Sequence, residues 1–597
     1  MTVQERISSL RLLMKEKNID AYIIPSSDNH QSEYVGEHFK CREFMSGFSG
    51  SAGDLVVTKD KAGLWTDARY FIQATKQLSG SEIILYKMGE PDVPSMEEFL
   101  QNELKSGDCL GFDGRVVAMQ EGQALASNLS KQNVRIDYSH DLVNEIWTKR
   151  PALSEEPAFL LSEKYSGEST ASKLSRIRES MKEAGALVHV LTTLDDICWI
   201  INMRGNDIEY SPMILSYLIV KMDSADLFIN ENKLNEEQKK LLKEDGIILH
   251  PYNDIYDEVK GFNSEVTVLI DPKKINYAIY NNIPDTVKKI ERANPSTLFK
   301  AIKNAVEIDN IKKAHIKDGV AVTKFMYWMK TTIGKEKITE VSAAEKLDSF
   351  RKEGEGYLWQ SFESICSYKE HAAIVHYSAT PETDVEVLPS HMFLNDTGGN
   401  YYEGTTDITR TFILGETTQE ERLHFTTVAR SMLNLADAKF LYGCSGYNLD
   451  ILARKPMWDL NLDFKHGTGH GVGYLLSVHE GPAGFRWQQL SNRNESHVLE
   501  DGMVITDEPG IYIEDSHGVR LENELLVRKG MKNEFGQFMY LEPITFAPID
   551  LDGIVPGEMT LEEKERLNSY HKKVYEVISP YLDDNERNWL ETYTREI

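Results

Sequence analysis

Five residues that could bind metal ions lie in the second half of the chain, each beside a strand-like or glycine-rich segment. Asp396 ends MFLND, Asp407 lies in GTTDITRTFIL and His470 lies in HGTGHGVG. Glu508 follows MVIT in TDEPG, and Glu522 lies in GVRLENELLV. Four carboxylates and one imidazole form a hard ligand set, which suits Mn²⁺ or Co²⁺ and tolerates Zn²⁺.

The charge of this set favours two metal ions over one. A single divalent cation cannot neutralise four converging carboxylates, whereas two can. Two ions would also lower the pKa of a bridging water and make it a nucleophile near neutral pH. We therefore expect two divalent metal ions per subunit, with Mn²⁺ preferred and Co²⁺ or Zn²⁺ as alternatives, and metal-assisted hydrolysis as their chemistry.

The segment HGTGH carries two histidines, His466 and His470. Their spacing would suit a helical His-x-x-x-His pair, but Gly467 and Gly469 disfavour a helix. A loop that brings both imidazoles near one site is the better interpretation.

The elements that must position these residues belong to an α+β section. Helical patterns cover 303–318, 321–331 and 340–352; strands follow Cys366, with a further helix at 419–441 and a helical tail at 561–581. The sequence before this section alternates helix and short apolar runs, with a helix at 7–17 and strands at 21–25, 54–58 and 63–66. This alternation indicates an α/β domain.

The front half of the chain shows signs of duplication. Met14, Lys15 and Glu16 precede one strand, and Met181-Lys182-Glu183 precedes another at 187–191. We therefore predict related domains at 1–150 and 151–300, followed by a catalytic domain at 301–597.

Composition restricts the partners and the compartment. The 597 residues include 94 acidic and 66 basic ones, giving a net charge of -28, which disfavours nucleic acid as a partner. The five cysteines are widely spread, so we expect neither a disulfide framework nor a thiolate zinc site. No signal peptide and no run of eighteen apolar residues is visible. We expect a cytoplasmic protein with no membrane partner.

Longer motifs connect the chain to a known family. LNDTGGNYYEGTTDITRTF, HGTGHGVGYLLSVHEGP, DGMVITDEPGIY and GVRLENELLV resemble the signature segments of pita-bread metallopeptidases, which include methionine aminopeptidase, prolidase and aminopeptidase P. SGFSGSAG, TDARYFIQA and LDDICWIINMRGNDIEYSP resemble the first two domains of three-domain aminopeptidase P. The resemblance implies two related creatinase-like α/β domains followed by a pita-bread catalytic domain.

The resemblance also assigns roles to residues. It implies that Asp396 and Asp407 hold one metal, and that Asp407, His470, Glu508 and Glu522 hold the other, with Asp407 and Glu522 bridging. His376 and His466 would position the scissile peptide and stabilise charge on its oxygen, and His479 would contact substrate around the proline. Arg520 and Glu522 share a face of a strand, so Arg520 would orient this bridging carboxylate. Tyr512, four residues after Glu508, resembles the family's other donor to the ligands. Phe362 matches a pocket-lining aromatic residue, although core packing would explain it equally well.

The implied activity is that of an Xaa-Pro aminopeptidase acting on short peptides whose second residue is proline. The resemblance implies a metal-bridging hydroxide as nucleophile and Glu508 as the proton shuttle to the leaving nitrogen. Proline makes a tertiary amide without an N–H, so a peptidase that binds this N–H loses a contact. The resemblance further implies a homodimer.

Other members of the fold remain alternatives. Prolidase would cleave dipeptides only and usually has one N-terminal domain; methionine aminopeptidase lacks such a long N-terminal region. Creatinase-like enzymes and metal-free binding proteins of this fold lack the ligand set. One segment departs from the family: Tyr368, Lys369, Glu370 and His371 replace a turn that contains Gly and Asn. This change puts the fine substrate preference in doubt.

Overall fold

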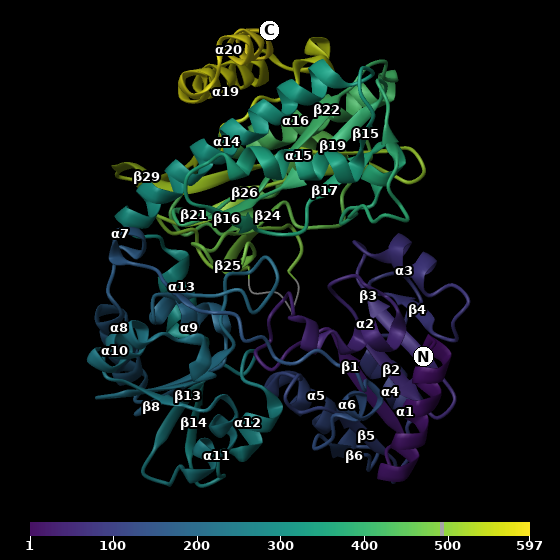
Figure 1. Ribbon diagram of the computed structural model, residues 1–597, viewed down its shortest axis with the longest axis vertical. Coiled ribbons are helices and arrows are strands. Elements are labelled where there is room, and N and C mark those ends of the chain that lie inside the picture. Colours follow the sequence, from purple (N-terminus) through teal and green to yellow (C-terminus); the bar gives the residue numbers. More distant parts are fainter. Residues whose placement is uncertain (490–494) are drawn as a thin grey trace. The chain divides into compact units, whose positions relative to one another are not determined.

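The computed structural model describes residues 1–489 and 495–597 (Figure 1). Its internal contacts divide the chain into two compact units. Unit 1 comprises Met1–Leu161 and Glu168–Ser296, and unit 2 comprises Ser162–Gly167 and Thr297–Ile597. The first two predicted domains therefore lie in unit 1 apart from Ser162–Gly167 and residues 297–300, and their boundaries at 150 and 300 stay a prediction.

Unit 1 contains two six-stranded sheets of the same topology. The first is formed by β1 (Ala21–Pro25), β2 (Asp54–Thr58), β3 (Ala62–Thr66), β4 (Ile84–Lys87), β5 (Cys109–Phe112) and β6 (Arg135–Asp137), and the second by β8 (Val188–Leu191), β10 (Ser216–Lys221), β11 (Ala225–Ile229), β12 (Ile247–His250), β13 (Thr267–Ile270) and β14 (Lys288–Glu291). Their orders are β4-β3-β2-β1-β5-β6 and β12-β11-β10-β8-β13-β14. In each sheet the central strand has one antiparallel and one parallel neighbour. The shared order and directions confirm the predicted duplication.

Helix α1 (Val3–Lys17) shows how local sequence defines an element in unit 1. Thr2 and Glu5 form a capping box that satisfies free backbone N–H groups at its first turn. Ile7, Leu10 and Met14 recur every three or four residues and are buried on one face. The predicted helix starts at residue 7, because the apolar pattern begins there and the cap lies earlier.

Buried polar contacts join the two halves of unit 1. The His30 ring contacts the Thr192 carbonyl through Nδ1 at 2.8 Å and the Tyr252 hydroxyl through Nε2 at 2.6 Å. The Met119 N–H donates to the Ile275 carbonyl at 2.8 Å. Burial lowers the pKa of His30, so the neutral ring makes these contacts.

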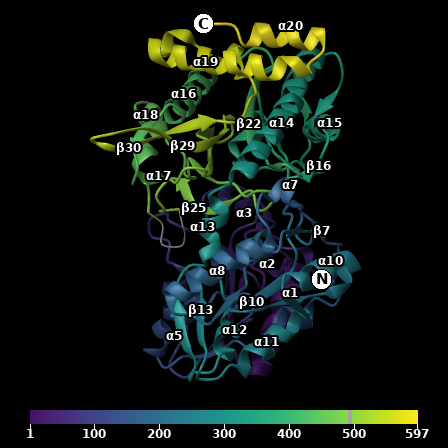
Figure 2. The same ribbon diagram turned by 90° about the vertical axis from the view of Figure 1, so that its left-hand side faces the viewer.

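Unit 2 combines long helices with three sheets relevant to the site. The helices are α14 (Ala305–Thr332), α15 (Glu340–Lys352), α16 (Gln419–Ala436), α19 (Leu561–Ile578) and α20 (Asp584–Tyr593). The two C-terminal helices, drawn in yellow, pack against α14, and α19 also packs against α16 (Figures 1 and 2). No helix among the described residues is both long and apolar enough to cross a membrane.

Three predicted helices of unit 2 differ from the structure in extent, and α20 was not predicted. The predicted helices at 303–318 and 321–331 are one continuous helix, α14. Gly319 does not break it; a Cβ there would lie 2.3 Å from the Phe546 carbonyl oxygen, so glycine permits close packing. Helix α16 ends at Ala436 because the last predicted residues form strand β23 (Lys439–Leu441). Helix α15 matches its predicted range.

Candidate metal centre

Strand pairing in unit 2 brings the predicted ligands together from distant parts of the chain. Strand β19 (Met392–Thr397) pairs antiparallel with β22 (Ile408–Ile413), so that Asp396 lies opposite Thr409, two residues after Asp407. Strand β26 (Val504–Asp507) pairs with β29 (Asn523–Asn533), which places Glu508 and Glu522 at the same end of that pair. His470 is the middle residue of β24 (Gly469–Gly471), which also pairs with β26.

Three of these residues form a compact group of potential ligand atoms. Asp407, His470 and Glu522 each offer one such atom, and the three atoms lie within 4.8 Å of one another. His470 Nε2 is 3.5 Å from Asp407 Oδ2 and 3.6 Å from Glu508 Oε1. Glu508 therefore lies at the edge of the same group.

Asp396 is held from one side by Arg520, the last residue of β28 (His517–Arg520). Arg520 Nε donates to Asp396 Oδ2 at 3.1 Å, while the buried Oδ1 has no hydrogen-bond partner among the described residues. We expected Arg520 to orient Glu522, but its carboxylate partner is Asp396. Glu522 lies beyond the end of β28, and its Oε2 instead accepts from Thr409 Oγ1 at 2.8 Å.

The buried carboxylates of this group repel one another, so nearby positive charge would stabilise their ionised forms. Burial, followed by the charges of neighbouring carboxylates, raises the pKa of Asp407 and of Glu522 well above their ordinary values. Burial also raises the pKa of Glu508, although His470 and Arg520 oppose the shift. Several carboxylates with one imidazole in a buried site, including an orphaned oxygen on Asp396, fit two divalent cations.

The predicted substrate histidines lie around the ligands in different ways. His466 Nε2 contacts the Tyr512 hydroxyl at 2.9 Å, and that hydroxyl accepts from Arg520 Nη1 at 2.7 Å. Burial lowers the pKa of His466 well below its ordinary value, so its ring is neutral. His479 packs edge-to-face on the His470 ring, with centroids 4.2 Å apart.

The other two predicted substrate residues precede the ligands in the chain. His376 directly follows Val375, whose carbonyl accepts from Arg520 Nη2 at 3.3 Å. Phe362 is half-buried between β16 (Tyr357–Gln360) and β17 (Ile365–Tyr368). The roles of both residues stay predictions.

The glycines of HGTGH have a geometric reason. A Cβ at Gly469 would lie 1.8 Å from the Thr506 carbonyl oxygen, because β24 and β26 approach closely there. The segment is not helical, as its glycines predict, and its last two residues belong to β24. The imidazole of His470 is thereby placed beside Glu508 without a helix.

Two buried residues next to Asp407, Glu524 and His315, were not predicted from the sequence. Glu524, fully buried, accepts from the Asp407 N–H at 2.8 Å and pairs with His315 Nε2 at 3.1 Å. Burial opposes protonation of His315, but the Glu524 charge raises its pKa overall. Thr409, whose hydroxyl donates to Glu522, could have been found because it lies two residues after Asp407, near the start of β22. His315, on α14, gave no comparable signal.

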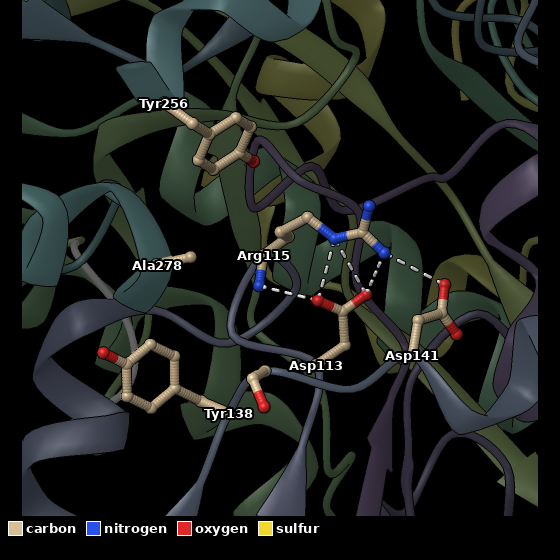
Figure 3. A pocket seen from close by; sticks show the side chains of 7 residues that line it. Asp113, Arg115, Tyr138, Asp141, Tyr256 and Ala278 are labelled. Carbon is tan, nitrogen blue, oxygen red and sulfur yellow. Dashed lines mark hydrogen bonds and ion pairs between the residues drawn. The ribbon is translucent and has the colours of Figure 1, made fainter. Parts of the chain in front are cut away.

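Unit 1 has a cavity of about 200 Å³ with different chemistry (Figure 3). Arg115 lies between two carboxylates, with Nη2 2.7 Å from Asp113 Oδ2 and 3.0 Å from Asp141 Oδ2. Arg150 neutralises Asp141 further, at 2.7 Å. The two aspartates of this cavity and the two arginines neutralise one another through these ion pairs. The site in unit 2, where burial and mutual repulsion raise the pKa of two carboxylates, is therefore the better candidate for catalysis.

Comparison with protein families matches the chain in consecutive sections. The Creatinase/Prolidase N-terminal domain matches residues 6–146 and, in a second version, residues 149–307. Metallopeptidase family M24 matches residues 309–529, and its C-terminal region matches residues 537–597. "Aminopeptidase P2" of Arabidopsis thaliana is 38% identical over 635 residues, spanning 100% of this chain and 89% of that protein. This chain belongs to the aminopeptidase P family.

Other members of the aminopeptidase P family agree over the same length. "Aminopeptidase P1" of Arabidopsis thaliana is 36% identical and spans 100% of this chain and 99% of that protein. The X-prolyl aminopeptidase of Caenorhabditis elegans is 33% identical, covers both chains completely and superposes with a TM-score of 0.96. That protein is described as a cytosolic enzyme with a di-nuclear active site. The predicted family and the predicted fold are thus confirmed.

Proposed function

We propose that this chain is an Xaa-Pro aminopeptidase, which releases the N-terminal residue of peptides that have proline in second place. One observation carries the proposal: Asp407, His470 and Glu522 bring ligand atoms together in a buried site, with Glu508 beside them, in a chain whose full length matches Xaa-Pro aminopeptidases. The two divalent metal ions that fit this site make the protein a metallohydrolase.

The ligands divide between the two ions as follows in our proposal. Asp396 and Asp407 hold one ion, and Asp407, His470, Glu508 and Glu522 hold the other. When bound, the ions supply an activated water and positive charge opposite the developing oxyanion. We propose Mn²⁺ as the native metal because oxygen ligands outnumber the single nitrogen. Metal analysis of protein purified without added metal, followed by reactivation of the stripped enzyme, tests this choice; zinc content with no response to Mn²⁺ would contradict it.

The side chains around the ions bind and orient the peptide. Glu508 accepts a proton and delivers it to the leaving proline nitrogen; burial raises its pKa, which suits a group that exchanges protons. His376 and neutral His466 face the scissile carbonyl and stabilise charge on its oxygen. His479 and Phe362 contact the proline side of the substrate, where a rigid ring without an N–H is accepted.

We propose that the enzyme is a homodimer. Exposed apolar side chains are present on unit 2, where Trp458 is 39% and Trp487 47% exposed and their rings pack edge-to-face. Apolar surface of this kind is common at subunit interfaces. Sedimentation equilibrium would give about twice the 68.0 kDa chain mass for a dimer; the chain mass itself would exclude it.

We also propose that the protein works in the cytoplasm. Its five cysteines are free thiols, and Cys109, Cys198 and Cys366 are buried. Free thiols are stable in a reducing compartment. Cell fractionation with immunodetection tests this location, and recovery in a secreted or membrane fraction would contradict it.

The deciding experiment compares three peptides after metal stripping and Mn²⁺ addition. Release of arginine from Arg-Pro-Pro, with little hydrolysis of Arg-Pro or Met-Ala-Ser, is the expected result. Preference for Arg-Pro would instead make the protein a dipeptidase. Asp407→Ala should be inactive, whereas the matched control Asp459→Ala, at an exposed surface ion pair, should keep full activity.

A further inference from the structure

The segment that leads to His376 has an unusual course. After β17 it forms a short helical turn, η5 (Lys369–Ala373), that begins at Lys369 with a φ of 55°. This left-handed conformation is unfavourable for a residue with a Cβ relative to right-handed backbone. Contacts elsewhere in the segment must therefore hold it in place.

The buried carboxylate of Glu340 provides those contacts. Glu340 is the first residue of α15 and has no exposed surface. It accepts from the Tyr368 N–H at 2.7 Å, from His371 Nδ1 at 3.0 Å and from the Tyr377 hydroxyl at 2.8 Å. The rings of His371 and Tyr377 also pack together, with centroids 4.5 Å apart. One buried carboxyl group thus accepts hydrogen bonds from the beginning, the middle and the end of the segment.

The far side of the segment contacts the strand that carries Arg520. A Cβ at Gly518 would lie 1.8 Å from the Ala372 carbonyl oxygen, so segment and strand touch through their backbones. The Val375 carbonyl accepts from Arg520, which also holds Asp396. His376 therefore lies between a residue tied to Arg520 and a residue tied to Glu340.

We propose that Glu340, His371 and Tyr377, here called the Glu340 clasp, position His376 for catalysis. The inference rests on the proposed aminopeptidase function and adds three positioning residues to it. The clasp does not touch the substrate. It keeps the His376 imidazole where negative charge develops in the transition state, so loosening it lowers kcat more than it raises KM.

The test measures kcat and KM on Arg-Pro-Pro for two variants of one residue. His371→Leu removes the hydrogen bonds to Glu340 and should lower kcat by about tenfold or more, with KM within about twofold. His371→Asn keeps a nitrogen near the place of Nδ1 and should recover most of the loss. The matched control is His250→Leu, which breaks another imidazole–carboxylate pair, to Asp226 at 2.8 Å in unit 1, and should leave kcat unchanged.

A double-mutant cycle shows whether the clasp acts through His376. In a His376→Ala background, His371→Leu should cause little further loss, because the positioned group is already gone. Equal fold-losses in both backgrounds, or equal kcat for His371→Leu and wild type, would overturn the proposal. Tyr377→Phe removes only the hydroxyl and replaces His371→Leu in the cycle should that variant fail to fold. Wild-type inactivity on Arg-Pro-Pro would instead refute the proposed function itself.

Discussion

Arg520 and Asp396 are 124 residues apart in the sequence, yet Arg520 Nε lies 3.1 Å from Asp396 Oδ2. The same guanidinium donates to the Tyr512 hydroxyl at 2.7 Å and to the Val375 carbonyl at 3.3 Å. A planar guanidinium spreads five N–H donors over three nitrogens and so reaches these three separate acceptors, whereas the three donors of an ammonium group all lie on one nitrogen. Arg520 thereby holds Oδ2 of Asp396, and Oδ1 is left for the proposed metals.

Replacing this guanidinium should therefore weaken the metal centre. We expect Arg520→Lys to reduce metal affinity or kcat/KM by about 10- to 100-fold, measured by metal titration and by hydrolysis of Arg-Pro-Pro. Arg528→Lys is the control, because Arg528 is partly exposed and its ion pairs at 3.6 and 3.9 Å are loose. Wild-type affinity and activity in Arg520→Lys would show that the pairing with Asp396 is dispensable.

Metal removal should make stability depend on pH in a particular direction. The folded, metal-free protein has raised pKa values at Asp407 and Glu522, so it binds more protons than the unfolded chain above their ordinary values of 3.8 and 4.5. Its free energy of unfolding should therefore fall as pH rises from about 4 toward neutrality.

Chemical denaturation with and without chelator can isolate this effect. Metal-free Asp407→Asn should be more stable than metal-free wild type at pH 7.5, and the difference should shrink at lower pH, because the raised pKa lets the wild-type carboxyl gain a proton more readily than it would in the unfolded chain. With metal bound, wild type should be the more stable of the two. A pH-independent difference in the metal-free state would contradict the raised pKa of Asp407.

The buried ion pair of Glu480, the residue after His479, should contribute strongly to the free energy of unfolding. Glu480 pairs with Lys303 and lies 3.5 Å from the Lys300 ammonium, and all three side chains are at most 3% exposed. Glu480→Gln leaves buried ammonium charge uncompensated and should cost about 3–5 kcal/mol of unfolding free energy. Glu353→Gln, at an exposed pair with Lys324, should cost less than about 1 kcal/mol. Similar losses in urea denaturation would contradict this difference.

A single methyl group should disrupt the strand that carries His470. Gly469→Ala places a Cβ 1.8 Å from the Thr506 carbonyl oxygen, so β24 and β26 must separate. We expect loss of metal binding and of more than about 99% of activity, because small displacements of ligands are costly. Gly557→Ala, whose Cβ meets no atom within 4 Å, is the control. Normal metal binding in Gly469→Ala would show that the strands adjust.

The five proposed ligands were visible in the sequence because each lies in a distinctive motif and because strand alternation limits where its side chain points. Helix α15 was equally visible, since its range follows from local pattern. The two-helix interpretation of α14 was wrong because Gly319 is a weak helix former, and its packing against Phe546 is a tertiary contact that local pattern does not contain.

Contacts between distant residues were the part that the sequence did not reveal. Side-chain alternation along one strand suggested that Arg520 orients Glu522. However, β28 ends at Arg520, and the carboxylate that Arg520 contacts is Asp396, from another strand. The sequence showed that His371 lies in a segment that departs from the family pattern, but it did not show which residue His371 contacts. Its partner Glu340 is 31 residues earlier, at the start of a helix, and only folding shows that the two meet.

The polar contacts between the two halves of unit 1 have a consequence for shortening the chain. Removing residues 1–150 would strip Tyr252 of its imidazole partner and leave the Ile275 carbonyl without the Met119 N–H. Polar groups that are buried in unit 1 would then lose their partners and become exposed to water. The two halves of unit 1 depend on each other for these buried contacts, so we expect that a shortened version of this enzyme has to retain both.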